Sequence, residues 1–105
     1  MKLLIITCIQ ESLPSVKQLL QQADIPIFSI SETTGIRQNG KENLLNEWFG
    51  SGRGEVASYF LFSFTLASKA AEAIQLINQF NEKQETGFPV RGFVVPVETS
   101  SDMNA

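Results

Sequence analysis

Residues 3–9 form a near-continuous apolar run, Leu-Leu-Ile-Ile-Thr-Cys-Ile. A strand with this pattern is typically covered on both of its faces, so it belongs at the centre of a sheet. Residues 56–66 form a second and longer run of the same kind. Alternation along it sorts the side chains onto two faces, with Phe60, Phe62 and Phe64 on one face and Tyr59 and Leu61 on the other.

Two further segments repeat apolar residues at helical spacing and therefore predict amphipathic helices. Ser12 is the predicted N-cap of the first helix, which ends before Pro26, and Ser68 is the predicted N-cap of the second. The positions expected to face the core are Leu13, Val16, Leu19, Leu20 and Ala23 in the first helix and Ala70, Ala73, Ile74, Ile77 and Phe80 in the second.

Prolines mark the two remaining strands, one beginning at Ile27 and the other covering 90–97. Pro26 precedes the first of these strands and Pro96 lies near the end of the other. Because proline cannot donate a hydrogen bond to a neighbouring strand, both strands are expected at sheet edges. The order β-α-β-β-α-β then predicts an α+β, ferredoxin-like sandwich with both helices on one face of the sheet.

The other face of this predicted sheet would have no helix to cover it, although the two inner strands are apolar on both faces. We expect that face, with Tyr59, Leu61 and alternate residues of 3–9, to be covered by other copies of the chain. The alternative is a mildly apolar face that stays in contact with water.

The composition sets the class of protein. The chain has 105 residues, which predicts one domain over 1–97 followed by a frayed polar tail at 98–105. A formal net charge of −3 disfavours non-specific binding to nucleic acid or to an anionic membrane. The apolar start of the chain is too short to span a bilayer, so no membrane insertion is expected.

Reactive side chains are scarce. The sequence has no histidine, and its single cysteine, Cys8, is expected to be a small buried hydrophobe and not a nucleophile. One cysteine cannot form an intrachain disulfide, which fits a cytoplasmic location. No paired core carboxylates replace the missing histidine as acid and base, so the chain is not expected to be an enzyme.

A long polar segment, residues 36–55, separates two strands that are expected to pair. Connections of this length in a small domain usually have a function of their own or are disordered. The loop includes apolar side chains at helical spacing, which either dock on a partner or fold back on the protein itself. The predicted partner-binding residues are Leu44, Leu45, Trp48, Phe49 and Arg53.

The element order and residues 29–40, Ser-Ile-Ser-Glu-Thr-Thr-Gly-Ile-Arg-Gln-Asn-Gly, resemble the PII-like superfamily of trimeric signalling proteins. In that superfamily a strand ends in glycine, and an Arg-Gln-x-Gly element opens a long T-loop. The resemblance implies a homotrimer that binds an adenine nucleotide or a similar effector in clefts between subunits. It also implies that the T-loop regulates a partner, such as a membrane transporter or a regulatory protein. By resemblance, the effector-binding residues are Gly35, Arg37, Gln38, Thr86, Gly87 and Arg91, the last in place of the B-loop lysine that this sequence lacks.

Simpler roles remain open for these residues. Gly35 can be a turn residue that ends a strand, Gly87 can cap the helix before it, and Arg91 can protect an edge strand from unwanted pairing. A second function is also open, that of a metal-responsive accessory protein of a metal tolerance or efflux system with the same fold. Its metal ligands would be the loop carboxylates Glu42, Glu47 and Glu55.

Overall fold

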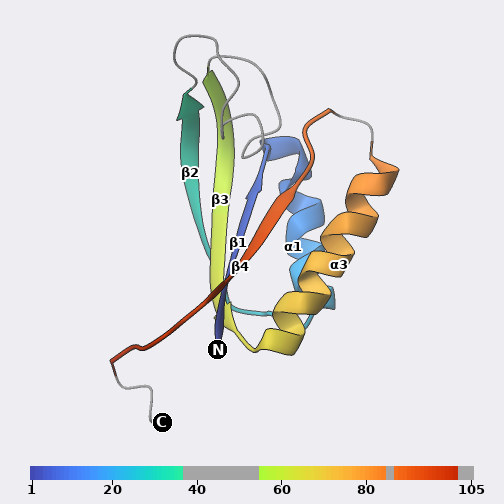
Figure 1. Cartoon of the computed structure of the whole chain (residues 1–105). Coiled ribbons are helices and arrows are strands. Elements are labelled where there is room, and N and C mark those ends of the chain that lie inside the picture. Colours follow the sequence, from blue (N-terminus) through green and yellow to red (C-terminus); the bar gives the residue numbers. More distant parts are fainter. Residues whose placement is uncertain (37–54, 85–86, 102–105) are drawn as a thin grey trace.

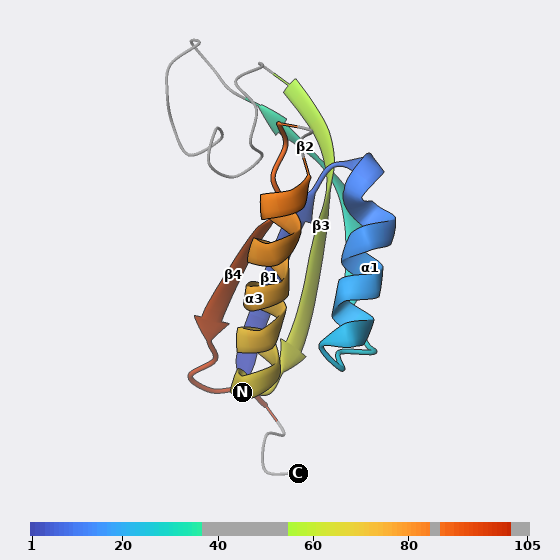
Figure 2. The same cartoon turned by 90° about the vertical axis from the view of Figure 1, so that its right-hand side faces the viewer.

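The computed structural model describes residues 1–36, 55–84 and 87–101. Their order is β1 (Lys2–Cys8), a 3-10 turn η1 (Gln10–Ser12), α1 (Leu13–Gln22), β2 (Ser29–Ile36), β3 (Glu55–Thr65), α3 (Ala67–Lys83) and β4 (Arg91–Pro96). The strands form one antiparallel sheet in the order β2-β3-β1-β4. Both helices cover the same face of this sheet (Figures 1 and 2). The α+β class is confirmed, and the arrangement is compatible with a small ferredoxin-like fold.

The two apolar strands, β1 and β3, occupy the centre of the sheet, and the proline-marked strands β2 and β4 form its edges, as expected. Pro96 is the last residue of β4. β2 begins two residues later than expected, at Ser29. The carbonyl of Ile27 instead accepts a hydrogen bond from the Ser63 hydroxyl at 2.7 Å, so a side chain takes the place of a strand partner there.

The core lies between the sheet and the helices. Leu4, Ile6 and Leu61 of the inner strands are each 1% exposed and belong to one buried cluster with residues of both helices. The helices can approach the sheet closely because small residues lie at the contact. A side chain added at Gly92 of β4 would place its Cβ 2.7 Å from Ile77 Cδ1 and 2.9 Å from Ile74 Cδ1. Gly92 therefore faces α3, and it makes room for those isoleucines.

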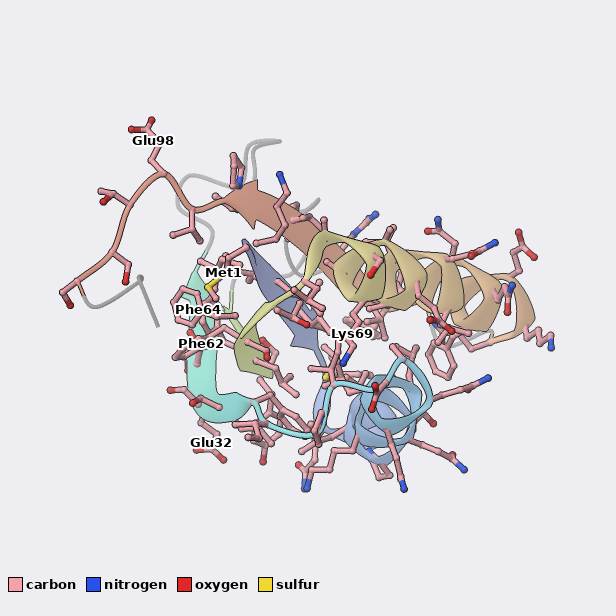
Figure 3. All side chains as sticks on the ribbon, turned by 90° about the horizontal axis from the view of Figure 1, so that it is seen from below. Met1, Glu32, Phe62, Phe64, Lys69 and Glu98 are labelled. Carbon is pink, nitrogen blue, oxygen red and sulfur yellow. The ribbon has the colours of Figure 1, made fainter. Side chains whose placement is uncertain are left out.

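The prediction that Tyr59 and Leu61 lie on the face of β3 without helices is wrong. Leu61 is buried in the core beneath the helices and Tyr59 packs against that core, so the phenylalanines lie on the face without helices, as Figure 3 shows for Phe62 and Phe64. The ring centroids are 5.9 Å apart between Phe60 and Phe62 and 6.3 Å apart between Phe62 and Phe64. α3 packs closely on the sheet at Gly92, and close packing favours the smaller side chains of Leu61 and Ser63 on this face over three phenyl rings.

The predicted N-cap position is confirmed for Ser12, although its side chain makes no capping hydrogen bond, and it is wrong for Ser68. Ser12 lies at the N-cap position of α1 but has helical torsion angles, φ −89° and ψ −8°, because it also ends the 3-10 turn, and its side chain makes no capping hydrogen bond. The N-cap of α3 is Leu66, which is extended. Ser68 lies inside the first turn of α3, and the Leu66 carbonyl accepts the hydrogen bond from the Ala70 amide.

Candidate functional site

The predicted effector residues that the structure describes fall into two groups at opposite edges of the sheet. Gly35 lies in β2 and pairs with Val56, whereas Arg91 begins β4 and pairs with Thr7. β3 and β1 separate these edge strands. With neighbouring strands about 4.8 Å apart, the two edges lie about 14 Å from each other. Within one subunit, the predicted effector residues are therefore divided between two separate places.

Gly35 is buried and paired as a strand residue, and β2 continues beyond it to Ile36. The interpretation of Gly35 as a turn residue is therefore wrong. A glycine in a strand often marks a place where another backbone or a ligand approaches closely. The resemblance expects a glycine that ends this strand, whereas β2 continues one residue further, to Ile36.

Arg91 lies on the face of the sheet opposite the helices, because its neighbour Gly92 faces α3. The side chain is half-buried, and its Nε atom has no hydrogen-bond partner among the described residues. The Ser58 hydroxyl on β3 is also buried without a partner in the described part of the chain. Since buried polar groups are normally hydrogen-bonded, these two groups retain unused capacity for a polar ligand. β4 is an edge strand, so protection of that edge also remains a role for Arg91.

Gly87 has φ 81°, a left-handed conformation that glycine adopts without strain. A lack of space for a side chain does not explain the glycine at this position, since a Cβ added there would meet no atom of the described residues within 4 Å. The prediction that Gly87 caps the preceding helix is wrong, because Gln84 is the C-cap of α3 and its amide donates to the Phe80 carbonyl at 3.1 Å. Gly87 therefore shapes the connection that leads into β4.

Asn81 of α3 fixes the start of β4. Its Nδ2 donates to the Val90 carbonyl at 2.8 Å, and its Oδ1 accepts from the Val90 amide at 2.9 Å. The side-chain amide thus pairs with both backbone groups of Val90, as a neighbouring strand would do. Because Val90 directly precedes Arg91, this contact helps to set the position of Arg91 at the start of β4.

The remaining predicted residues lie outside the described part of the chain. They are Arg37, Gln38 and Thr86 of the effector site, and Leu44, Leu45, Trp48, Phe49 and Arg53 of the partner-binding loop. Of the proposed metal ligands, Glu42 and Glu47 also lie outside it, and the side chain of Glu55 at the start of β3 is not described. Within residues 1–36, 55–84 and 87–101, no three metal-ligating side chains form a group.

No pattern in the sequence indicated a contact between Glu32 of β2 and Tyr59 of β3. The two residues are cross-strand partners, and Tyr59 Oη donates to Glu32 Oε2 at 3.3 Å. Partial burial and the neighbouring carboxylate both raise the pKa of Tyr59. Only the register of β2 on β3 could reveal this pair, and the long loop between the strands hides that register in the sequence.

Among the helices that the structure describes, none has the length and apolar character needed to cross a bilayer. No protein-family model matches this chain, and no curated protein matches it.

Proposed function

We propose that this chain is a cytoplasmic, PII-like regulatory protein. It assembles as a homotrimer, binds a small anionic effector such as an adenine nucleotide in the clefts between subunits, and regulates a membrane transporter or a regulatory protein through the loop 36–55. The observation that carries this proposal is the separation of Gly35 and Arg91 at the two opposite edges of the sheet.

Edges that are about 14 Å apart in one subunit come together when the β2 edge of one copy lies beside the β4 edge of the next. Such a head-to-tail contact is heterologous, and it closes into a ring when the rotation between copies allows it. Each cleft would then contain Gly35 from one subunit and Gly87 and Arg91 from its neighbour. The predicted effector residues that lie at opposite edges of one subunit would thus meet in the cleft between two subunits.

The face of the sheet without helices supports assembly. Phe64 is 56% exposed and Val95 is 39% exposed, and both belong to strands whose other side chains on that face are largely apolar. Exposed apolar surface of this kind marks an interaction site in a small protein. Burying this surface between copies would stabilise a trimer in which the loops lie at the subunit contacts.

The Arg91 Nε atom has no hydrogen-bond partner among the described residues, and this supports an anionic effector. A guanidinium is permanently charged and can donate two parallel hydrogen bonds to a phosphate or carboxylate. The free hydrogen-bonding capacity of this group favours an anion over a neutral ligand.

The assembly is tested by analytical ultracentrifugation of the wild type and of Phe64→Glu. We expect a trimer for the wild type and smaller species for the variant, because a carboxylate would have to be buried in the contact. Lys17→Glu is the control, since it adds negative charge on the exposed side of α1. A folded wild-type monomer at micromolar concentration would refute the trimer.

The effector is tested by isothermal titration calorimetry with ATP, ADP, AMP, cyclic nucleotides and bicarbonate. We expect Arg91→Ala to bind the effector at least tenfold more weakly than the wild type, whereas Lys17→Ala should bind it with the wild-type affinity. If none of these compounds binds, the effector class is wrong even when the trimer is present.

A further inference from the structure

The hairpin of β2 and β3 extends well beyond the rest of the sheet. β1 ends at Cys8, which pairs with Tyr59, whereas β2 and β3 stay paired as far as Ile36 and Glu55. Figure 1 shows both strands projecting past the end of β1. On this projection the helix layer gives way to the 3-10 turn η1. A hollow of about 490 Å³ forms there, and we call it the hairpin hollow.

The walls of the hairpin hollow are mainly polar. They consist of Gln10 of η1, Glu32, Thr33 and Thr34 of β2, and Ser58 and Tyr59 of β3. Alternation along β2 puts the side chains of Glu32 and Thr34 on the helix side, where Tyr59 also lies. The volume is within the range of sites for small molecules, roughly 300–1,000 Å³.

Among the described residues that line the hollow, Glu32 is the only charged one. In the part of the chain that the structure describes, Lys69 and Asp24 form the ion pair, and no lysine or arginine pairs with Glu32. Within the described residues its carboxylate accepts one hydrogen bond, from Tyr59, although a carboxylate has about four acceptor positions. The hollow therefore favours a cation and disfavours the anionic effector of the proposed cleft.

A bare metal ion fits this chemistry poorly. Calcium takes six to eight oxygen ligands and magnesium six, usually with more than one carboxylate, whereas this hollow offers a single carboxylate. A guanidinium group suits the site better, since its planar fork matches a carboxylate and its face can stack on an aromatic ring. Tyr59 supplies such a ring beside Glu32.

We propose that the hairpin hollow binds a small organic cation with a guanidinium group, held by the Glu32 carboxylate against the Tyr59 ring, with Gln10 and Thr34 as polar neighbours. This site lies within a single subunit and does not depend on the proposed trimer or on its effector.

The test uses Tyr59 as a reporter, because it is the only tyrosine of the chain. The phenolate is followed by ultraviolet absorbance as pH rises, with methylguanidinium as the probe. Methylguanidinium stays charged throughout the titration, and methylurea is a neutral compound of similar shape. A bound positive charge favours the phenolate and lowers the pKa of Tyr59, by about half a pH unit for a charge roughly 6 Å away in largely aqueous surroundings.

We expect this shift in the wild type with methylguanidinium, and not with methylurea or with sodium chloride at equal ionic strength. Glu32→Gln should abolish the shift, whereas Glu72→Gln, which removes a carboxylate from the exposed side of α3, should retain it. Glu32 is exposed, so the variant Glu32→Gln is expected to fold, and circular dichroism checks its folding. The proposal is wrong if methylguanidinium shifts the pKa of Tyr59 no more than sodium chloride does. It is also wrong if the shift is equally large in Glu32→Gln.

Discussion

Tyr59 and Glu32 face each other across β3 and β2, and the phenol donates to the carboxylate over 3.3 Å. The contact joins the inner strand that carries the aromatic side chains to the edge strand that leads into the long loop. It also places a titrating group beside a fixed negative charge at the base of the projecting hairpin. The contact between the strands and its effect on titration can both be measured through the pKa of Tyr59, the only tyrosine of the chain.

Replacing Glu32 with glutamine should lower the pKa of Tyr59 toward its ordinary value of 10.0. Burial and the nearby carboxylate both raise that pKa, and the substitution removes the second cause only. A spectrophotometric titration of the wild type and of Glu32→Gln measures the difference. An unchanged pKa would mean that the two side chains do not interact in solution.

Cys8 should make the protein less stable at high pH. The thiol is buried, as predicted from its place in an apolar strand, and burial raises its pKa from 9.0 to about 11. A group with a raised pKa in the folded state contributes its full stability below the pKa of the unfolded state. That contribution is lost as pH rises from 9.0 through about 11.

The free energy of unfolding in urea, measured at several alkaline pH values, should therefore fall more steeply in the wild type than in Cys8→Ala. The comparison isolates the thiol, since lysines and Tyr59 titrate in both proteins. Parallel curves would show that the thiol is as easily ionised in the folded chain as in the unfolded chain.

Removing the Asn81 side chain should destabilise the start of β4. In Asn81→Ala both backbone groups of Val90, which is 1% exposed, lose their partner. Each buried group left unpaired costs about 1–3 kcal/mol. Asn78→Ala, an exposed change on the same helix, should cost less than about 1 kcal/mol. Chemical denaturation together with hydrogen exchange at the Val90 amide gives both results, and similar losses in the two variants would contradict this role.

Leu61 and Phe64 lie on opposite faces of β3, so truncating them should have different effects. Leu61→Ala removes a fully buried side chain and should cost about 2–5 kcal/mol whatever the protein concentration. Phe64 is 56% exposed in one subunit, so Phe64→Ala should destabilise mainly by weakening association. Thermal unfolding at several concentrations separates the two cases. A loss in Phe64→Ala that does not vary with concentration would argue against this face as a contact.

The element order and the places of the strands in the sheet could be predicted because they depend on local patterns. Apolar runs mark β1 and β3 as inner strands, and Pro26 and Pro96 mark β2 and β4 as edges. The faces of β3 could not be predicted from alternation alone. Alternation shows that Phe60 and Leu61 point in opposite directions, but it does not show which direction the helices occupy.

The candidate sites were predictable to different degrees. The resemblance named Gly87 and Arg91 as effector residues, and that role stays a prediction. The structure gives Gly87 a left-handed conformation, and the Arg91 Nε atom has no hydrogen-bond partner among the described residues. The pair of Glu32 and Tyr59 was not predictable, since the two residues are 27 positions apart and only the strand register brings them together. The same holds for Asn81 and Val90, where a side chain substitutes for a strand.

Asn81 links α3 to the edge of the sheet through its two hydrogen bonds to Val90. Because both of its hydrogen bonds to Val90 run through one rigid amide, a displacement of the last turns of the helix pulls the first residue of β4 with it. A force applied to the outer surface of α3 would thus reach the guanidinium of Arg91 without passing through the aromatic face. A molecule that binds the exposed side of α3 is therefore expected to change the position of Arg91 in the proposed cleft without contacting that cleft.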